Sequence, residues 1–213
     1  MVSDLHKLQH FTITLTWGII NMSSLRAIID IANIYNSFLF YRGGNVLDTN
    51  IKLRQEVYRN DALKIIDWLD DIEVTKYLNE KDGISKSVSN VVENVNMPIL
   101  THLFNQNGSF FIILDNNDPI GFLRLVHKGS KAEMVLAIGD REKWGKGLGP
   151  TAIKEGLKTA FFNWRVDEVI AKINFKNHRS KKAFTKVGFE EDIKLQREMQ
   201  YSMSWKNFIA LAA

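Results

Sequence analysis

Apolar and polar residues alternate along several short stretches of the chain, and this alternation predicts β-strands with one buried face. A clear case is 51–58, where Ile51, Leu53 and Val57 alternate with charged or polar neighbours. Stretches with a similar pattern, or with a short apolar run, are 11–17, 110–115, 121–127, 131–138, 169–175 and 195–205. The chain is therefore expected to form a β-sheet.

Other segments place apolar residues three or four positions apart, which predicts amphipathic helices. The expected helices are 24–42, a short helix that is capped by Asn60 or Asp61 and carries Leu63, Ile66 and Trp68, and the segments 74–78, 85–97, 151–164 and 177–187. Pro98 is expected to end or bend the helix before it. Helices interspersed among strands indicate an α+β fold.

The stretch Trp144–Gly149 holds three glycines between the predicted strand 131–138 and the predicted helix 151–164. Glycine lets backbone N–H groups approach an anion, and the first turn of a helix has N–H groups without an intrahelical partner. A strand, a glycine loop and a helix N-terminus together predict a phosphate-binding site. A plain glycine-rich turn that caps a helix is the alternative.

Spacing separates the phosphate motifs that compete for this loop. A P-loop needs four residues between its first glycine and Gly-Lys, but five separate Gly139 from Gly145, and Gly147 follows the lysine. A dinucleotide fingerprint needs G-x-G-x-x-G, whereas this loop has G-x-G-x-G followed by Pro150. The pyrophosphate loop of a coenzyme A site remains.

Charge and composition narrow the function classes. The net charge of the 213-residue chain is +4, but residues 140–186 hold 12 Lys or Arg against 5 Asp or Glu. The basic excess therefore lies on and after the glycine loop. A polyanionic cofactor explains that position; a nucleic acid would as well, but no nucleic-acid-binding motif accompanies it.

The absence of cysteine excludes disulfides and thiolate metal sites, and it suits a cytoplasmic protein. The five histidines lack paired ligand spacing, so no metal site is expected. Residues 1–10 do not have the pattern of a secretory signal, and charged residues interrupt 11–41. We therefore expect neither a signal peptide nor a membrane span.

The loop resembles the Gln/Arg-x-x-Gly-x-Gly/Ala motif of the GNAT family of N-acetyltransferases, with Trp144 in the Gln/Arg place. Its Trp-Gly-Lys-Gly form is similar to that of the ribosomal-protein and spermidine acetyltransferase branch. A second segment, Asn177-x-x-Ser180 followed by Phe184-x-x-x-Gly188-Phe189, is similar to the family's Asn-x-x-Ser…Tyr-x-x-x-Gly-Phe segment.

The resemblance covers roughly residues 51–204. It implies the GNAT fold, a mixed, mostly antiparallel sheet of about 6–7 strands flanked by helices. We expect a GNAT domain at 51–213 and an N-terminal strand–helix extension at 1–50. The extension either packs on the sheet or on a partner subunit, or acts as a substrate lid.

The resemblance implies acetyl-CoA as the cofactor. The residues expected to bind it are Leu136, Ala137, Ile138, Lys143, Trp144, Gly145, Lys146, Gly147, Leu148, Gly149, Thr151, Asn177 and Ser180. Main-chain N–H groups of the loop would bind the diphosphate. Asn177 would bind the pantetheine arm and is also placed to be a helix N-cap, and the two roles are compatible.

The implied reaction is direct transfer of an acetyl group to an amine, which a base must first deprotonate. Glu133 occupies the place from which family members use a glutamate; a solvated carboxylate paired with Lys131 or Arg124 is the alternative. Phe184 stands where the family often has a tyrosine that protonates the departing thiolate. Tyr201, water or the substrate's own ammonium would have to supply that proton.

Three function classes follow. The first is an acetyltransferase that acts on a small-molecule amine or a protein N-terminus. The second is a GNAT-fold protein that binds acyl-CoA without efficient transfer, and the third is a basic nucleic-acid-binding module. For the first class we expect an amine substrate as partner, no nucleic acid and no membrane; a homodimer is left open.

Overall fold

The computed structural model describes residues 50–78, 83–106 and 108–211. The strand expected at 11–17 and the helix expected at 24–42 lie outside these ranges. The two-part division of the chain at residue 50 therefore stays a prediction, and the fold below is that of the described residues after Gly44.

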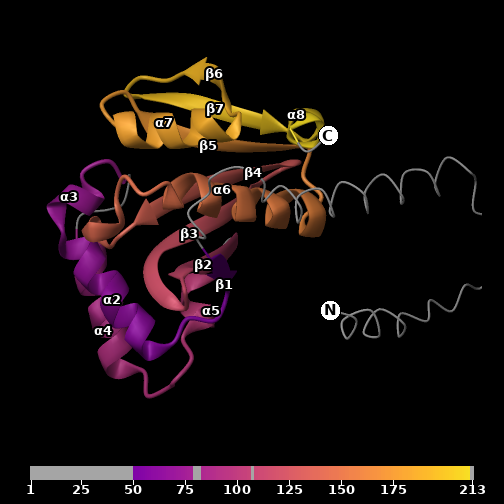
Figure 1. Cartoon of the computed structure of the whole chain (residues 1–213). Coiled ribbons are helices and arrows are strands. Elements are labelled where there is room, and N and C mark those ends of the chain that lie inside the picture. The colour runs from indigo at the N-terminus through magenta and orange to yellow at the C-terminus, as the bar shows by residue number, and fades with distance from the viewer. Residues whose placement is uncertain (1–49, 79–82, 107, 212–213) are drawn as a thin grey trace, which may run out of the picture. The chain divides into compact units, whose positions relative to one another are not determined.

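Seven strands form one sheet in the order β1-β2-β3-β4-β5-β7-β6 (Figure 1). Their bounds are β1 Ile51–Arg54, β2 Gly108–Asp115, β3 Asp118–Lys128, β4 Lys131–Ile138, β5 Glu168–Asn174, β6 Glu190–Lys194 and β7 Glu198–Ser204. The β4–β5 pair is parallel, and the other neighbours are antiparallel. The expected mixed, mostly antiparallel sheet is confirmed.

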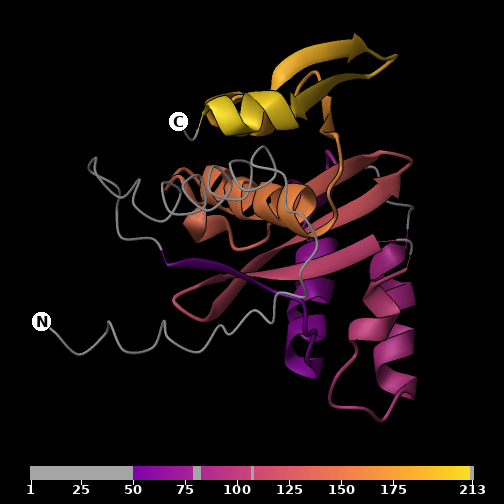
Figure 2. The same ribbon diagram turned by 90° about the vertical axis from the view of Figure 1, so that its right-hand side faces the viewer.

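The helices are α2 Arg59–Asp70, α3 Ile72–Thr75, α4 Ile84–Asn94, α5 Thr101–Phe104, α6 Leu148–Lys158, α7 His178–Val187 and α8 Trp205–Ala210. A 3₁₀ turn, Arg141–Lys143, precedes α6, and a π-helical turn, Thr159–Asn163, follows it. The helices lie on both faces of the sheet (Figure 2).

The two faces of the sheet hold different helices because successive strand residues point to opposite sides. Ala62 and Ile65 of α2 and Val92 of α4 share a buried cluster with Phe122 and Ala137. On the other face, Gly156 of α6 packs so closely on Leu123 and Met134 that an added Cβ would lie 2.7 Å from Leu123 and 2.8 Å from Met134. Helix α6 therefore covers the face opposite to α2 and α4.

Strands β4 and β5 are paired over only three residues, from Lys131↔Glu168 to Glu133↔Ile170. After Glu133 the two strands separate, and β4 continues for five residues with β3 as its neighbour. This separation exposes one edge of β4 in the middle of the sheet, immediately before the glycine loop. It positions the candidate site.

Several predicted boundaries were wrong. The first strand ends at Arg54 rather than at 58, and Leu63 of α2 is 49% exposed. The helix expected at 74–78 is only Ile72–Thr75. Strand β6 was missed because its five residues, Glu-Glu-Asp-Ile-Lys, are all exposed and carry no apolar alternation.

The helix expected at 151–164 begins earlier and changes type. Helix α6 starts at Leu148, which is buried, and the last turn is π-helical, with the N–H of Trp164 donating to the carbonyl of Thr159 at 3.1 Å. The wider turn brings Phe161 and Phe162 against Trp205 and Phe208. Helical periodicity alone does not report such a turn.

Candidate functional site

A cavity of about 460 Å³ opens beside the exposed edge of β4. Three further walls surround it: the glycine loop, α7 and the α3 segment. The lining residues are Glu73, Val74, Tyr77, Leu78, Leu136, Ala137, Ile138, Lys143, Trp144, Gly145, Gly147, Leu148, Gly149, Pro150, Asn177, Arg179, Ser180, Lys182, Ala183 and Lys186. The structure thus brings together eleven of the thirteen residues expected to bind the cofactor.

The β4 wall presents backbone donors. Gly139 donates its N–H to the carbonyl of Ile120 on β3 at 2.8 Å. Because the backbone groups of a strand face alternate edges, those of Ala137 also face β3, and those of Leu136 and Ile138 face the cavity. The Ile138 carbonyl accepts a hydrogen bond from Nε1 of Trp144 at 2.8 Å, which agrees with this direction.

The glycine loop turns sharply into α6. Gly145 and Gly147 both have φ of +78°, a conformation that residues with a Cβ adopt at a cost. Gly147 is the N-cap of α6, and no side chain caps this helix. The N–H groups of Leu148 and Gly149 in its first turn therefore remain available to an anion, and the helix dipole favours negative charge there.

Lys143 fixes the loop rather than offering a free charge. Its Nζ donates to Oδ2 of Asp115 at 2.7 Å, and its backbone N–H donates to the carbonyl of Asp140 at 3.2 Å. The hydrogen bond to Asp115 raises the pKa of Lys143 above 10.5. The ammonium group is thus held at the end of β2.

The α7 wall begins with Asn177, whose Oδ1 accepts a hydrogen bond from the backbone N–H of Ser180 at 3.1 Å. The predicted N-cap role of Asn177 is confirmed; both residues also line the cavity. Sequence reasoning missed Arg179, Lys182 and Lys186 on this wall. Their spacing of three and four residues places them on one helical face, and that signal was available in the sequence.

The α3 wall contributes Glu73, Val74, Tyr77 and Leu78. A hydrogen bond from Lys76 is the main cause that lowers the pKa of Glu73 below 4.5, so Glu73 is ionised at neutral pH. The sequence did not predict these residues as lining, because this segment has no motif.

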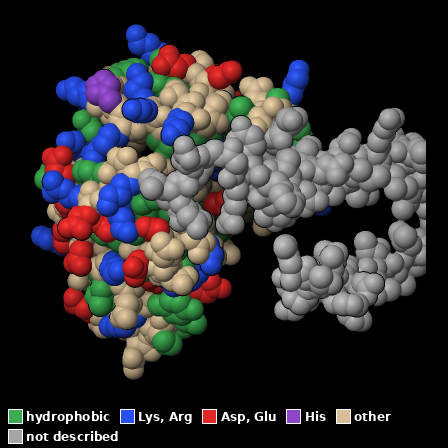
Figure 3. Space-filling model, viewed as in Figure 1, with side chains coloured by type: hydrophobic (Ala, Val, Ile, Leu, Met, Phe, Trp, Pro, Cys, Tyr) green, Lys and Arg blue, Asp and Glu red, His purple; other side chains and the backbone are tan. Residues whose placement is uncertain are grey.

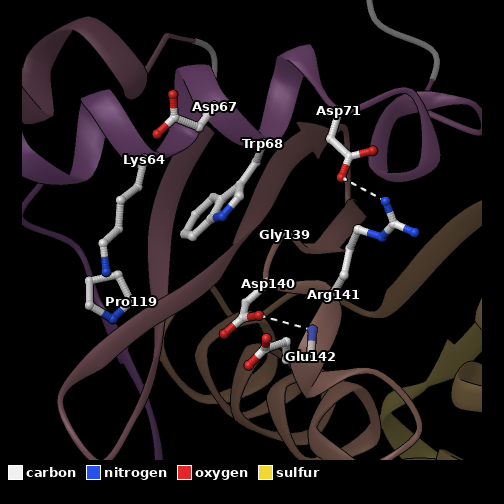
Figure 4. Close-up of a pocket in the computed structure, with 9 residues that line it drawn as sticks. All are labelled: Lys64, Asp67, Trp68, Asp71, Pro119, Gly139, Asp140, Arg141 and Glu142. Atoms are coloured by element: carbon white, nitrogen blue, oxygen red, sulfur yellow. Dashed lines mark hydrogen bonds and ion pairs between the residues drawn. The ribbon is translucent and has the colours of Figure 1, made fainter.

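A second cavity, of about 380 Å³, lies beside the first part of the β4–α6 connection, residues 139–142, which precedes the glycine loop (Figure 4). The residues around it show how α2 and α3 are attached to this connection. Asp71, the N-cap of α3, forms an ion pair with Arg141 at 3.5 Å. The indole of Trp68 lies against Gly139, where an added Cβ would be 2.2 Å from the ring. These contacts hold α2 and α3 against the β4–α6 connection.

Glu133 lies at the last paired position before β4 and β5 separate. Its Oε2 is 3.3 Å from Nζ of Lys172 and 3.8 Å from Nζ of Lys128, and its side chain is 17% exposed. The ion-pair partners are therefore not the predicted Lys131 or Arg124. Glu133 is three residues from Leu136, so about 10 Å of strand separates it from the cavity wall.

Neither Phe184, which stands in the family's tyrosine place, nor Tyr201, the tyrosine considered as the proton donor, lines the cavity. Phe184 is buried and packs edge-on against Phe189. Tyr201 is fully buried, does not line the cavity and donates its hydroxyl to Oε1 of Glu191 at 2.9 Å. Burial, followed by that hydrogen bond, raises the pKa of Tyr201 to about 12. This geometry gives no support to Tyr201 as the acid.

Two expected cofactor residues, Lys146 and Thr151, do not line the cavity. Lys146 is exposed on the loop, and the Thr151 hydroxyl donates to the carbonyl of Gly147 at 3.3 Å inside α6. Over the described ranges, no group of three metal-ligating side chains occurs and no helix is long and apolar enough to cross a membrane.

Comparison with known proteins identifies the fold. Residues 51–190 match the family model described as Acetyltransferase (GNAT) domain. A relative from Bacillus licheniformis, named Uncharacterized N-acetyltransferase p20, is 26% identical over 136 residues, which are 62% of this chain and 75% of the relative.

Solved acetyltransferase structures are similar in fold. Spermidine N-acetyltransferase from Vibrio cholerae, in complex with CoA and spermine, has a TM-score of 0.63 and 18% identity, covering 75% of this chain and 98% of that one. Aminoglycoside acetyltransferase AAC(6')-Ib, in complex with coenzyme A, has a TM-score of 0.63 and 16% identity, covering 77% of this chain and 100% of that one.

Proposed function

The chain belongs to the GNAT acetyltransferase family, and from this premise we propose that it transfers the acetyl group of acetyl-CoA directly to a primary amine within a ternary complex. The observation that carries the proposal is the separation of β4 from β5 beside an uncapped helix N-terminus. That arrangement offers one row of donors for a diphosphate and another for an acyl thioester.

The residues present fit the cofactor. Backbone N–H groups between Gly145 and Gly149 would bind the diphosphate, and the open edge of β4 at Leu136 and Ile138 would pair with the pantetheine amides. Asn177 and Ser180 lie beside this path on α7. Acetyl-CoA supplies an acyl thioester; the chain supplies its orientation and the proton transfers.

The reaction needs three groups of the protein. A backbone N–H from Leu136 or Ile138 would donate to the carbonyl oxygen as negative charge develops there. Glu133, which does not line the cavity, would accept a proton from the acceptor ammonium through a chain of waters, so that nitrogen can attack the carbonyl carbon. As the C–N bond forms and the C–S bond breaks, the departing sulfur needs a proton.

We assign that last proton to Tyr77. It is the phenol among the described residues that line the cavity, whereas Phe184 has no proton and Tyr201 is bound to Glu191.

We expect the acceptor to be a small cationic amine rather than a protein N-terminus. Support comes from the spermidine and aminoglycoside acetyltransferases that share the fold.

A thiol-release assay with acetyl-CoA and a panel of polyamines, aminoglycosides and N-terminal peptides tests the proposal. We expect thiol release that depends on the amine, with one thiol released for each acetylated product that mass spectrometry detects. Binding of acetyl-CoA without release over the whole panel would favour the alternative, a GNAT-fold protein that binds acyl-CoA without efficient transfer.

A further inference from the structure

We propose that the cavity face of α7, formed by Arg179, Lys182 and Lys186, is a phosphomonoester site that takes the 3′-phosphate of coenzyme A and makes the protein prefer CoA over dephospho-CoA. The inference rests on the proposed function, since it assumes that the cavity holds the cofactor. Trp144 is the positioning residue of this site.

The three cations share one side of α7. They are separated by three and four residues, which is the spacing of one helical face, and all three line the cavity. In the space-filling view, Lys and Arg side chains gather over the part of the molecule where α7 lies (Figure 3). Glu73 is the acidic residue among the described residues that line the cavity.

The glycine loop cannot supply the same charge. Lys143, which immediately precedes the loop, is held by Asp115 at 2.7 Å, and the lysine within the loop, Lys146, does not line the cavity. The loop therefore offers neutral backbone donors to a ligand, while α7 offers side-chain cations. The cavity is divided into a wall of amides and a wall of positive charge.

The phosphate groups of coenzyme A differ in the same way. Each phosphate of the diphosphate carries one negative charge at neutral pH, and backbone N–H groups at a helix N-terminus suit it. The 3′-phosphate is a monoester with a second pKa of about 6, so it is close to a dianion at pH 7. Guanidinium and ammonium groups bind such a dianion better than amides do.

Trp144 holds Arg179 in place for this contact. The guanidinium carbon of Arg179 lies 3.6 Å from the centroid of the Trp144 ring, which is within the range of a cation–π contact. The hydrogen bond from Nε1 of Trp144 to Ile138 fixes the ring on the end of β4. A stacked guanidinium keeps its in-plane N–H groups free, so the stack orients Arg179 without consuming its donors.

Calorimetric titration with CoA and with dephospho-CoA tests the site. We expect wild-type protein to bind CoA at least about tenfold more tightly than dephospho-CoA. Each of the variants Arg179→Gln, Lys182→Gln and Lys186→Gln should reduce this affinity ratio about threefold to tenfold, as expected for charge-assisted contacts at a partly exposed site. Affinity for dephospho-CoA should change little. Lys181→Gln, on α7 but outside the cavity lining, is the matched control and should keep the ratio.

Trp144→Leu tests the positioning role. We expect it to lower the CoA preference as Arg179→Gln does, and the double variant to lower it no further, because both changes remove the same oriented group. Trp144→Phe keeps an aromatic face and should retain more of the preference.

The outcomes separate this inference from the proposed function. Equal binding of CoA and dephospho-CoA by wild-type protein, or an equal loss for both ligands in the α7 variants, would overturn the 3′-phosphate site and leave the acetyltransferase assignment intact. Absence of binding for both ligands would instead remove the proposed function on which the site depends.

Discussion

Nζ of Lys143 lies 2.7 Å from Oδ2 of Asp115, so the residue that precedes Trp144 is tied to the end of β2. Asp115 is 28 residues earlier in the chain, and the pair joins the residue before the glycine loop to the central sheet. Because this contact occupies the ammonium group of Lys143, we expect Lys143 to contribute less to phosphate binding than a free lysine would.

The Lys143–Asp115 pair should give a pH-dependent stability difference. Because the folded-state pKa of Lys143 is raised above 10.5, its contribution is complete below pH 10.5 and is lost as the pH rises through the raised value. We expect Lys143→Gln to lower the melting temperature by a constant amount between pH 7 and about pH 10, and the difference from wild type to shrink at higher pH. A difference that grows above pH 10.5 would contradict this account.

Gly147 allows a direct test of the loop conformation. Its φ of +78° makes an alanine strained, although an added Cβ would meet nothing within 4 Å. We expect Gly147→Ala to raise KM for acetyl-CoA with little change in kcat, since the loop amides lose their alignment. The backbone cost should be about 1–2 kcal/mol.

Gly129 provides the matched control for Gly147. It has φ of +65° in the turn between β3 and β4, with nothing within 4 Å of an added Cβ, and it does not line the cavity. Gly129→Ala should lose similar stability and keep the KM for acetyl-CoA. An equal effect of both substitutions on KM would show that the loop has no special role.

Glu133→Gln should lower kcat at neutral pH far more than it weakens acetyl-CoA binding. Removing a general base typically costs about 10²–10⁴-fold in rate. Initial rates across pH 6–9 with a saturating acceptor measure the effect. Glu190→Gln, on the exposed edge strand β6, is the control and should be silent. Equal turnover of Glu133→Gln and wild type would remove Glu133 from the mechanism.

Tyr77→Phe should reduce kcat by at least about tenfold with little change in the KM for acetyl-CoA, since it removes the proton proposed for the departing sulfur. Tyr201→Phe should leave kcat unchanged and destabilise the fold by about 1 kcal/mol through loss of its hydrogen bond to Glu191. If Tyr77→Phe has full activity, the sulfur takes its proton from the substrate nitrogen or from water.

Tyr201 should also ionise late. Its pKa of about 12 lies above the unfolded value of 10.0, so its contribution to stability is complete below pH 10 and is lost as the pH rises toward 12. The five tyrosines of the chain would all contribute phenolate absorbance near pH 11 if all were exposed. In an absorbance titration, the wild-type protein should show one phenolate fewer than this at that pH. Wild type and Tyr201→Phe should give equal phenolate absorbance at that pH.

Much of the central fold followed from the sequence because buried strands such as β4 show a clear apolar pattern. Strand β6 could not be found in this way, since all its residues are exposed and its place depends on pairing with β7. The glycine loop was located correctly because its backbone conformation requires particular residues. Arg179 was missed as a lining residue although its spacing from Lys182 and Lys186 was visible in the sequence. Its contact with Trp144, 35 positions earlier, could not be predicted, because local spacing does not report contacts between distant segments.

The measurement that tests the central claim most directly is a crystal structure of the wild-type protein with acetyl-CoA. We expect diphosphate oxygens within hydrogen-bond distance of backbone nitrogens between Gly145 and Gly149, and the thioester beside Leu136 and Ile138 on the open edge of β4. Acetyl-CoA bound elsewhere, with this cavity empty or closed, would contradict the account.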